Sequence, residues 1–272
     1  MKEYFQCSGR SVYVDKAIKE DLHDQSLKNS QFKRMVAIKK QFVNCDFRNS
    51  EFDSAYIRDC VFNSCDFTGC KFNQSNLRGS SFSGCRFDYS EFRQTHIEPE
   101  ILDDGLPMWV NLQQKFIQSL RVNFREIGDV DSENKAIVAE LNATKAHLKK
   151  SWSSKSPYYR SKFNGFERFV VFIEWIVFCV LDFFWGNGES VLKLARSFVV
   201  ALIVIAAFDL FIYGDWTTTL GIQDAFIRSC EMFFGISHPD EYSSFILSFL
   251  TFLRYVMLAC FVSIIIKRFA KR

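Results

Sequence analysis

A large apolar side chain recurs at every fifth position over a long stretch of this chain, a period that neither a helix nor a flat strand produces. One face of an α-helix recurs about every 3.6 residues, and one face of a strand every second residue. The positions with this period are Phe42, Phe47, Phe52, Ile57, Phe62, Phe67, Phe72, Leu77, Phe82, Phe87, Phe92 and Ile97. The period predicts a chain that turns a corner after every five residues and winds into a square solenoid around these side chains.

A second set of positions, two residues before the large ones, carries small side chains. Its members are Cys45, Ser50, Ala55, Cys60, Cys65, Cys70, Ser75, Ser80, Cys85, Ser90 and Thr95. Both sets are expected to point inwards, because a small side chain fits where opposite walls come closest. The cysteines of this set then act as compact core residues. Their intervals are multiples of five, with no histidine nearby before His96, so we expect no metal site.

The pentapeptides at residues 44–48 (NCDFR) and 64–68 (SCDFT) resemble those of the pentapeptide-repeat family. The resemblance implies a right-handed quadrilateral β-helix with four repeats in each coil and about three coils in total. We therefore assign residues 27–99 to a repeat domain and residues 1–26 to an N-terminal segment.

Two apolar runs near the end of the chain, residues 197–213 and 244–266, predict two transmembrane helices. At about 1.5 Å per residue both match a hydrocarbon layer about 30 Å thick, although the shorter run only just reaches across. The net charge of +3 and the overall share of 48% hydrophobic residues hide these runs. The alternative is a pair of buried helices in a globular domain.

Lysine and arginine flank these runs on one side of the predicted membrane, whereas the segment between the runs has Arg228 alone. The flanking set is Lys193, Arg196, Lys267, Arg268, Lys271 and Arg272. Because loops rich in these residues stay on the cytoplasmic side, both termini are expected there. The cysteine-rich repeats, and a chain start that does not read as an export signal, agree with this orientation. We expect a multi-pass protein of the bacterial inner membrane.

A third apolar stretch, residues 169–185, carries Glu174 and Asp182, which fall with Glu167 near one stripe of a helix. This pattern favours a helix that lies in the inner membrane interface. A third span is the alternative, and it would require the export of everything that precedes it.

The segment between the two spans is longer than a hairpin needs and predicts a pore loop. Residues 222–234 read as a short pore helix and residues 235–243 as the loop that returns to the second span. Irregular backbone at membrane depth is tolerated where it is buried in protein or lines water. The candidate filter residues are Phe234, Gly235, Ile236, Ser237, His238 and Asp240.

Charges in this outer segment are mostly acidic, and two more charges lie inside the apolar runs. The predicted acidic vestibule consists of Asp215, Asp224, Glu231 and Glu241. Such a ring attracts cations, although acids also keep an outer loop soluble. Asp209 and Arg254 are the intramembrane charges, and an unpaired arginine costs about 2.5–3.5 kcal/mol there. We therefore expect Arg254 to pair with Asp209 or Glu231, as a static clamp or as part of gating.

Residues 109–150 predict a helical hairpin with a tight turn at Gly128 and a second helix capped by Asp131 or Ser132. In this order of parts the chain resembles bacterial pentapeptide-repeat membrane proteins that end in a two-span potassium-channel-like pore module. The resemblance implies a homo-tetrameric channel. The Thr-Val-Gly-Tyr-Gly filter of such channels is absent, since residues 233–240 read FFGISHPD, and this favours a weakly selective cation pathway.

These observations divide the chain into five segments, 1–26, 27–99, 100–152 (helical hairpin), 153–192 (linker and interfacial helix) and 193–272 (pore domain). The four histidines are far apart and no catalytic motif is found, so we expect neither enzyme activity nor a cofactor. Balanced charge on a short solenoid argues against nucleic acid as a partner. The predicted function is an oligomeric cation channel regulated through the solenoid by an unknown cytosolic ligand or protein. The alternative is a membrane-anchored scaffold that does not conduct.

Overall fold

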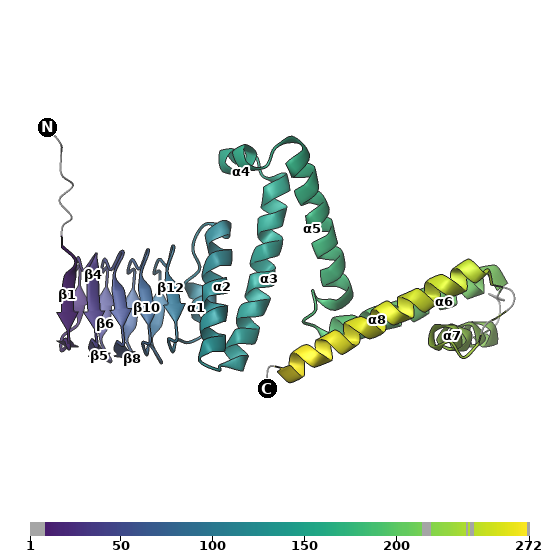
Figure 1. The fold of residues 1–272 in the computed structure, drawn as a ribbon, viewed down its shortest axis with the longest axis horizontal. Helices are drawn as coiled ribbons and strands as arrows, with labels where there is room; N and C mark the ends of the chain where they lie inside the picture. The colour runs from purple at the N-terminus through teal and green to yellow at the C-terminus, as the bar shows by residue number, and fades with distance from the viewer. Residues whose placement is uncertain (1–8, 214–218, 238, 240–241, 271–272) are drawn as a thin grey trace. The chain divides into compact units, whose positions relative to one another are not determined.

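The computed structural model describes residues 9–213, 219–237, 239 and 242–270 of the chain, and the backbone alone for residues 213, 219, 220, 268 and 270. The chain separates into two compact units, Met1–Asn164 and Gly165–Arg272. Figure 1 gives the labels of the elements, and each unit is described by itself.

The first unit begins as a parallel β-solenoid of about four turns. Its strands are β1 (Ser11–Val14), β2 (Ala17–Ile18), β3 (Leu22–His23), β4 (Ser30–Lys33), β5 (Val36–Ile38), β6 (Gln41–Val43), β7 (Glu51–Asp53), β8 (Tyr56–Arg58), β9 (Val61–Asn63), β10 (Lys71–Asn73), β11 (Ser81–Ser83) and β12 (Glu91–Arg93). Three sheets run along it, in the orders β1-β4-β7-β10-β12, β11-β9-β6-β3 and β2-β5-β8. A row of isolated bridges through Ser26, Asp46, Asp66 and Arg86 accompanies the sheets.

The core of the solenoid consists of the two periodic sets of side chains, all of which are buried, as the sequence predicts. The large side chains stack on one another from turn to turn, because parallel pairing keeps them in register. The rings of Phe52 and Phe72, for example, lie 4.8 Å apart at an interplanar angle of 5°. Stacked pairs of this kind add about 0.5–1.5 kcal/mol each beyond the burial of their area.

The small side chains connect neighbouring turns through hydrogen bonds. The hydroxyl of Ser75 donates to the carbonyl of Phe52 at 3.1 Å, and the thiol of Cys70 donates to the carbonyl of Phe47 at 2.9 Å. The cysteines at these positions therefore do more than fill space in the core. Each thiol also donates a hydrogen bond to a buried main-chain carbonyl.

The corners explain the period of five. At each corner one residue adopts a left-handed backbone conformation, with φ of 52° at Asn44, 54° at Asp59 and 71° at Gly69. Asparagine, aspartate and glycine tolerate this conformation best, which is why the positions between the inward pairs are polar or lack a side chain.

The solenoid starts at Ser11, earlier than the boundary at residue 27 that the sequence indicates. Its first turn is lined by Tyr13, Ile18, Leu22 and Leu27, which pack against the core. The estimate of about three coils was therefore too low, and most of the N-terminal segment belongs to the solenoid. The first turn escapes the period because the interval from Ile18 to Leu22 is four residues, and because none of these positions holds phenylalanine.

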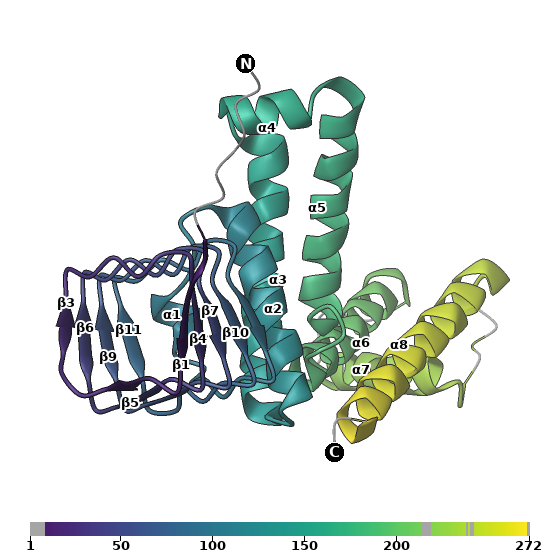
Figure 2. The ribbon, with the colours of Figure 1, turned by 60° about the vertical axis from the view of Figure 1, so that its left-hand side comes forward.

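Four helices complete the first unit: α1 (Ile101–Asp104), α2 (Val110–Glu126), α3 (Val130–Ser153) and α4 (Pro157–Lys162). Figure 2 shows α2 lying across the last turn of the solenoid, with α3 packed beside it. The turn between α2 and α3 contains Gly128 at φ 74°. The N-cap of α3 is Asp129, whose carboxylate accepts from the Ser132 amide at 3.0 Å, so the prediction of Asp131 or Ser132 as the cap was wrong.

The second unit contains α5 (Gly165–Trp185), α6 (Val191–Tyr213), α7 (Thr219–Phe234) and α8 (Ser244–Ala270). Over Val191–Ile212 and Ser244–Lys267, α6 and α8 are long and apolar enough to cross a membrane. Of the described helices, α5 does not meet this criterion. It packs against α6, over the stretch where the sequence predicts an interfacial helix.

Candidate functional site

The second unit is organised around α7, which folds back along α6. Phe198, in the first half of α6, packs its ring against Phe233 and Phe234 at the end of α7, with centroid distances of 5.1 and 6.0 Å. A buried cluster joins α6, α7 and the start of α8 and consists of Leu202, Ile205, Met232, Phe233, Tyr242 and Leu250. The last turn of α7 therefore lies beside the first half of α6, far from the end at which α6 leads into α7.

The end of α7 is a glycine-terminated helix end. Gly235 has φ 72°, its amide donates to the Met232 carbonyl at 3.1 Å, and the Ile236 amide donates to the Glu231 carbonyl at 2.8 Å. This pair of bonds is a Schellman motif, in which glycine takes the left-handed position without strain. Phe234 and Gly235 were both predicted as filter residues. Phe234 is the last residue of α7, and Gly235 is the glycine that caps it.

The other predicted loop residues are placed as follows. Ile236 is exposed and Ser237 is half-buried, whereas His238 and Asp240 lie outside the described residues. The backbone at Gly235 and Ile236 hydrogen bonds back into α7, so these two residues do not form an extended strand of carbonyl groups.

Arg254, about ten residues into α8, lies against the end of α7. A Cβ atom on Gly235 would collide with the Arg254 guanidinium in its present position, so the two residues are in close contact. The guanidinium also lies 5.2 Å from the centre of the Tyr255 ring. It borders a cavity of about 400 Å³ whose other described lining side chains are apolar, among them Phe198, Phe233 and Met257.

Asp209 pairs with α7 and not with Arg254. Its side chain is 0% exposed, one oxygen accepts from the Tyr242 hydroxyl at 2.5 Å, and the other lies 3.8 Å from Nε of Arg228. The prediction that Arg254 pairs with Asp209 or Glu231 was therefore wrong. Among the described residues Arg254 has no ion-pair partner. Nothing in the sequence indicated Arg228 as the partner of Asp209, because it is simply the one lysine or arginine in an acidic segment.

Two of the predicted vestibule acids lie on α7, where Asp224 is exposed and Glu231 half-buried. Arg228 stands between them on the same helix and turns to Asp209. Asp215 and Glu241 lie outside the described residues.

At the opposite end of α6, the flanking lysines form ion pairs that the sequence did not reveal. Lys193 lies 2.6 Å from a carboxylate oxygen of Asp182 on α5, and Lys267 of α8 pairs with Glu189 in the turn between α5 and α6. Arg196 donates to the Phe183 carbonyl and stacks on its ring at 4.5 Å. The ends of α5, α6 and α8 are thereby connected through one turn.

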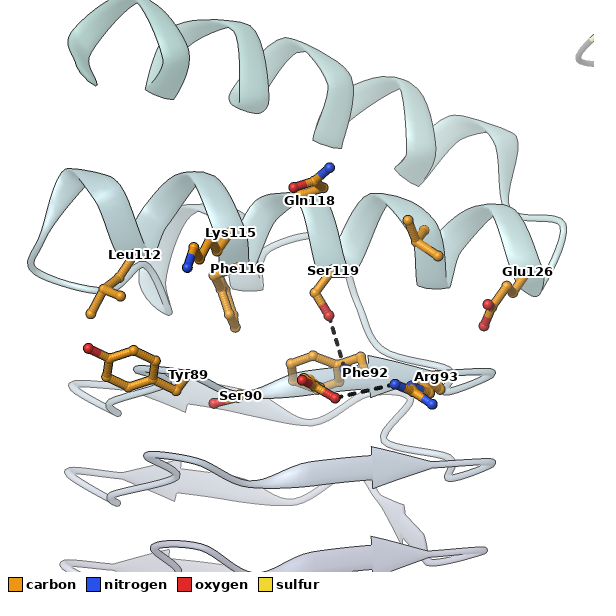
Figure 3. A pocket seen from close by; sticks show the side chains of 12 residues that line it. Tyr89, Ser90, Phe92, Arg93, Leu112, Lys115, Phe116, Gln118, Ser119 and Glu126 are labelled. Atoms are coloured by element: carbon orange, nitrogen blue, oxygen red, sulfur yellow. Dashed lines mark hydrogen bonds and ion pairs between the residues drawn. The ribbon is translucent and has the colours of Figure 1, made fainter. Parts of the chain in front are cut away.

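The first unit offers a second site at its capped end. A groove of about 670 Å³ lies between α2 and the last turn of the solenoid, and Figure 3 shows the side chains that line it. Ser119 accepts from the Phe92 amide at 3.2 Å within it. Its charged lining consists of Glu91, Arg93, Lys115 and Glu126. Two of these residues are acidic and two are basic.

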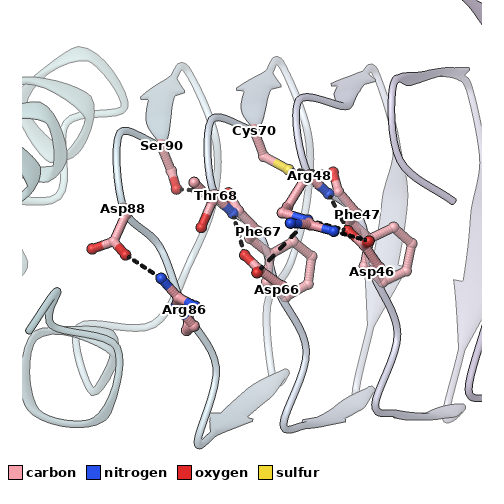
Figure 4. A network of polar contacts seen from close by, with 10 residues as sticks. All are labelled: Asp46, Phe47, Arg48, Asp66, Phe67, Thr68, Cys70, Arg86, Asp88 and Ser90. Atoms are coloured by element: carbon pink, nitrogen blue, oxygen red, sulfur yellow. Dashed lines mark hydrogen bonds and ion pairs between the residues drawn. The ribbon is translucent and has the colours of Figure 1, made fainter. Parts of the chain in front are cut away.

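One wall of the solenoid carries a polar ladder, shown in Figure 4. Arg48 bonds Asp46 at 2.7 Å and reaches Asp66 on the next turn at 3.9 Å, and Arg86 bonds Asp88 at 3.1 Å. The hydrogen bond from Arg48 keeps the pKa of Asp46 below its ordinary value. Within the described part of the chain, no group of three or more His, Cys, Asp or Glu side chains is arranged to hold a metal ion.

Comparison with known proteins agrees with this description of the first unit. Residues 38–103 match the profile of the pentapeptide repeat region family. No curated protein matches the chain. The molecule thus contains a pentapeptide-repeat solenoid and two helices with the length and composition of membrane spans.

Solved structures similar to this chain are pentapeptide-repeat proteins. A pentapeptide repeat protein from the thylakoid lumen of Arabidopsis thaliana has 15% identity and a TM-score of 0.22, with 35% of this chain and 76% of that chain covered. A structure of QnrB1, a plasmid-mediated fluoroquinolone resistance protein, has 15% identity and a TM-score of 0.19, with 34% of this chain and 64% of that chain covered.

Proposed function

We propose that this chain is a two-span membrane channel in which α7 re-enters the membrane and four copies surround a pathway for cations. The observation that carries the proposal is the return of α7 along α6, which brings its last turn beside Phe198 and Arg254. At about 1.5 Å per residue, Arg254 lies about 15 Å from the start of α8, which is mid-membrane for a spanning helix. A helix that enters to this depth and turns back there needs protein or water around its end.

The proposed orientation has both termini and the solenoid in the bacterial cytoplasm. It is supported by Lys193 and Arg196 near the start of α6 and by Lys267 near the end of α8, because these are the two ends that the segment containing α7 does not join. The proposed solenoid is right-handed and four-sided, and three sheets plus a row of bridges support four walls. We assign it no catalytic step and no cofactor.

In this proposal the solenoid receives a cytosolic ligand or protein, and α5 transmits the event as an interfacial helix. Support comes from the ion pair between Lys193 and Asp182, which attaches the start of α6 to the end of α5. A movement of α5 would therefore pull directly on the first span.

The test combines a measurement of ionic current through the protein with a measurement of how deeply α7 lies in the membrane. Purified full-length protein in planar bilayers should carry current in potassium and sodium salts, and native mass spectrometry should give four copies. Single cysteines in place of Ile222 and Phe234, two exposed residues near opposite ends of α7, should differ in labelling by an impermeant maleimide from the outside. Equal, rapid labelling of both positions, with no current, would refute the pore.

A membrane-anchored scaffold is the second candidate, and the helix end at Gly235 favours it. Amide bonds from Gly235 and Ile236 return into α7, so these residues offer no row of carbonyl oxygens to an ion. If the protein is a scaffold, planar bilayers that contain it should carry no current, and the solenoid should bind a cytosolic protein.

A further inference from the structure

Among the described residues of the second unit, no carboxylate forms an ion pair with Arg254, the charge in the middle of α8. The acid buried nearest the outer end of α6, Asp209, is already engaged by Tyr242 and Arg228. Arg254 instead faces the apolar cavity between α6, α7 and α8, with the ring of Tyr255 beside it. Its position therefore calls for an explanation other than an ion pair.

The end of α7 supplies the missing negative charge. Aligned peptide dipoles give the carboxyl end of a helix about −0.5 elementary charge, located on its last carbonyl groups. Gly235 closes α7 at this end, and the Arg254 guanidinium lies directly against it. The guanidinium occupies the space where a Cβ atom of residue 235 would lie, so it touches the helix end at its backbone.

We infer that Arg254 acts as a tethered cation at the end of α7 and sets the ion selectivity of the pathway. The inference rests on the proposed pore and assigns the group that governs which ions pass. The carboxyl end of a re-entrant helix is the place at which a permeant cation would be stabilised. In this protein the side chain of Arg254 occupies that place, so cations meet a fixed positive charge there.

The sign of the effect follows from the charges at this depth. Arg254 brings one full positive charge to the last turn of α7, where the helix end carries about −0.5 and the acidic side chain of Glu231 also lies. A ring of copies adds these charges, so Arg254 offsets most of the attraction that the constriction would otherwise have for cations, while the exposed Asp224 nearer the mouth attracts them. The wild-type pathway is therefore expected to pass small cations slowly and with little preference over chloride.

The experiment measures reversal potentials of the full-length protein in planar bilayers across a potassium chloride gradient. Arg254→Gln should raise the permeability of potassium relative to chloride by about tenfold or more, whereas Arg254→Lys should stay close to wild type. The matched control is Arg196→Gln, which removes the same charge at the far end of α6 and should leave the ratio unchanged.

A second variant reaches the same contact from the other side. Gly235→Ala adds a Cβ where the guanidinium lies, so it should displace Arg254 and shift the permeability ratio in the direction of Arg254→Gln. Unfolding of this variant is checked by its oligomer mass, and Arg254→Gln carries the test without it.

Each outcome separates the two claims. Current in the wild type with an unchanged ratio in Arg254→Gln would refute the role of Arg254 and leave the pore standing. If none of the three proteins (wild type, Arg254→Gln and Arg196→Gln) carries current, in bilayers that do conduct after gramicidin is added, the pore is refuted and the inference with it. An equal shift in Arg254→Gln and Arg196→Gln would show a general charge effect and overturn the assignment.

Discussion

Asn123 on α2 hydrogen bonds to the backbone of Thr95 at the last turn of the solenoid. It takes the place that the backbone of the next turn would have if the solenoid continued. Its side-chain oxygen accepts from the Thr95 amide and its side-chain nitrogen donates to the Thr95 carbonyl, both at 2.7 Å, and the residue is 0% exposed. Ser119 and Glu126 accept from the next open amides, those of Phe92 and Gln94. An open edge of a parallel solenoid invites pairing with other chains, and α2 removes that edge.

Replacing Asn123 by alanine should destabilise the first unit by about 2–4 kcal/mol, because both polar groups of Thr95 become buried without partners. The measurement is thermal or urea unfolding of the full chain in detergent, followed by circular dichroism at a wavelength dominated by strands. Gln118→Ala, an exposed change on the same helix, should alter the stability by less than about 0.5 kcal/mol. Equal effects of the two variants would contradict the capping role.

The stability of the solenoid should fall in alkaline solution because of its buried thiols. Burial raises the pKa of Cys70 from its ordinary 9.0 to about 12. Between these values the unfolded chain has lost a proton that the folded chain keeps, so the free energy of unfolding falls by up to about 1.4 kcal/mol per pH unit. Below about pH 9 this contribution is fully present.

Cys70→Ala should remove the part of this pH dependence that Cys70 contributes, which is read from urea unfolding of the wild type and the variant at about pH 8 and about pH 10.5. The difference in stability between the two proteins should become smaller at the higher pH. Ser75→Ala removes a small inward side chain that does not titrate, and its difference from wild type should be the same at both values. A constant difference for Cys70→Ala would contradict the prediction.

Tyr242→Phe should destabilise the second unit, because it removes the hydroxyl that donates to buried Asp209. A hydrogen bond to a charged group contributes about 1.5–3 kcal/mol, and Arg228 at 3.8 Å does not replace it. Thermal unfolding in detergent, followed by tryptophan fluorescence, measures the loss. Tyr255→Phe, on an exposed tyrosine of α8, serves as the control and should leave the melting temperature nearly unchanged.

The ion pair between Glu189 and Lys267 should show positive coupling in a double-mutant cycle. Each side chain is partly exposed, so the coupling is about 0.2–1 kcal/mol and decreases with salt. Glu189→Lys should destabilise the unit, and Lys267→Glu in the same chain should restore part of the loss. The melting temperatures of the wild type, the two single variants and the double variant, at low and high salt, give the coupling. If the effects of the two substitutions simply add, the ion pair makes no contribution and the prediction is wrong.

The repeats could be predicted from the sequence because their period is carried by large side chains. Each phenylalanine marks its own position, and the corners need polar or small residues in between. The first turn was missed because its four inward side chains are of three kinds and one interval is short, so that no single period describes it. A search that accepted any apolar residue at intervals of four or five would find Tyr13, Ile18, Leu22 and Leu27.

The candidate site was harder to predict because its contacts join residues far apart in the sequence. The apolar length of α6 and α8 is visible in the sequence, but nothing local pairs Asp209 with Arg228, or Arg254 with Gly235. A signal for Gly235 did exist, since a glycine after an apolar helix is the usual helix terminator. Asn123 gave none, because a single asparagine on a helix face does not reveal that it faces backbone groups.

The bonds that α2 makes to the solenoid involve main-chain groups of a kind that every turn possesses. A chain lengthened by one whole turn would present the same edge to the same helix, whereas a gain of a single residue would move every later inward side chain to the wrong place. Evolution can thus change how far the solenoid extends in steps of twenty residues without redesigning what terminates it.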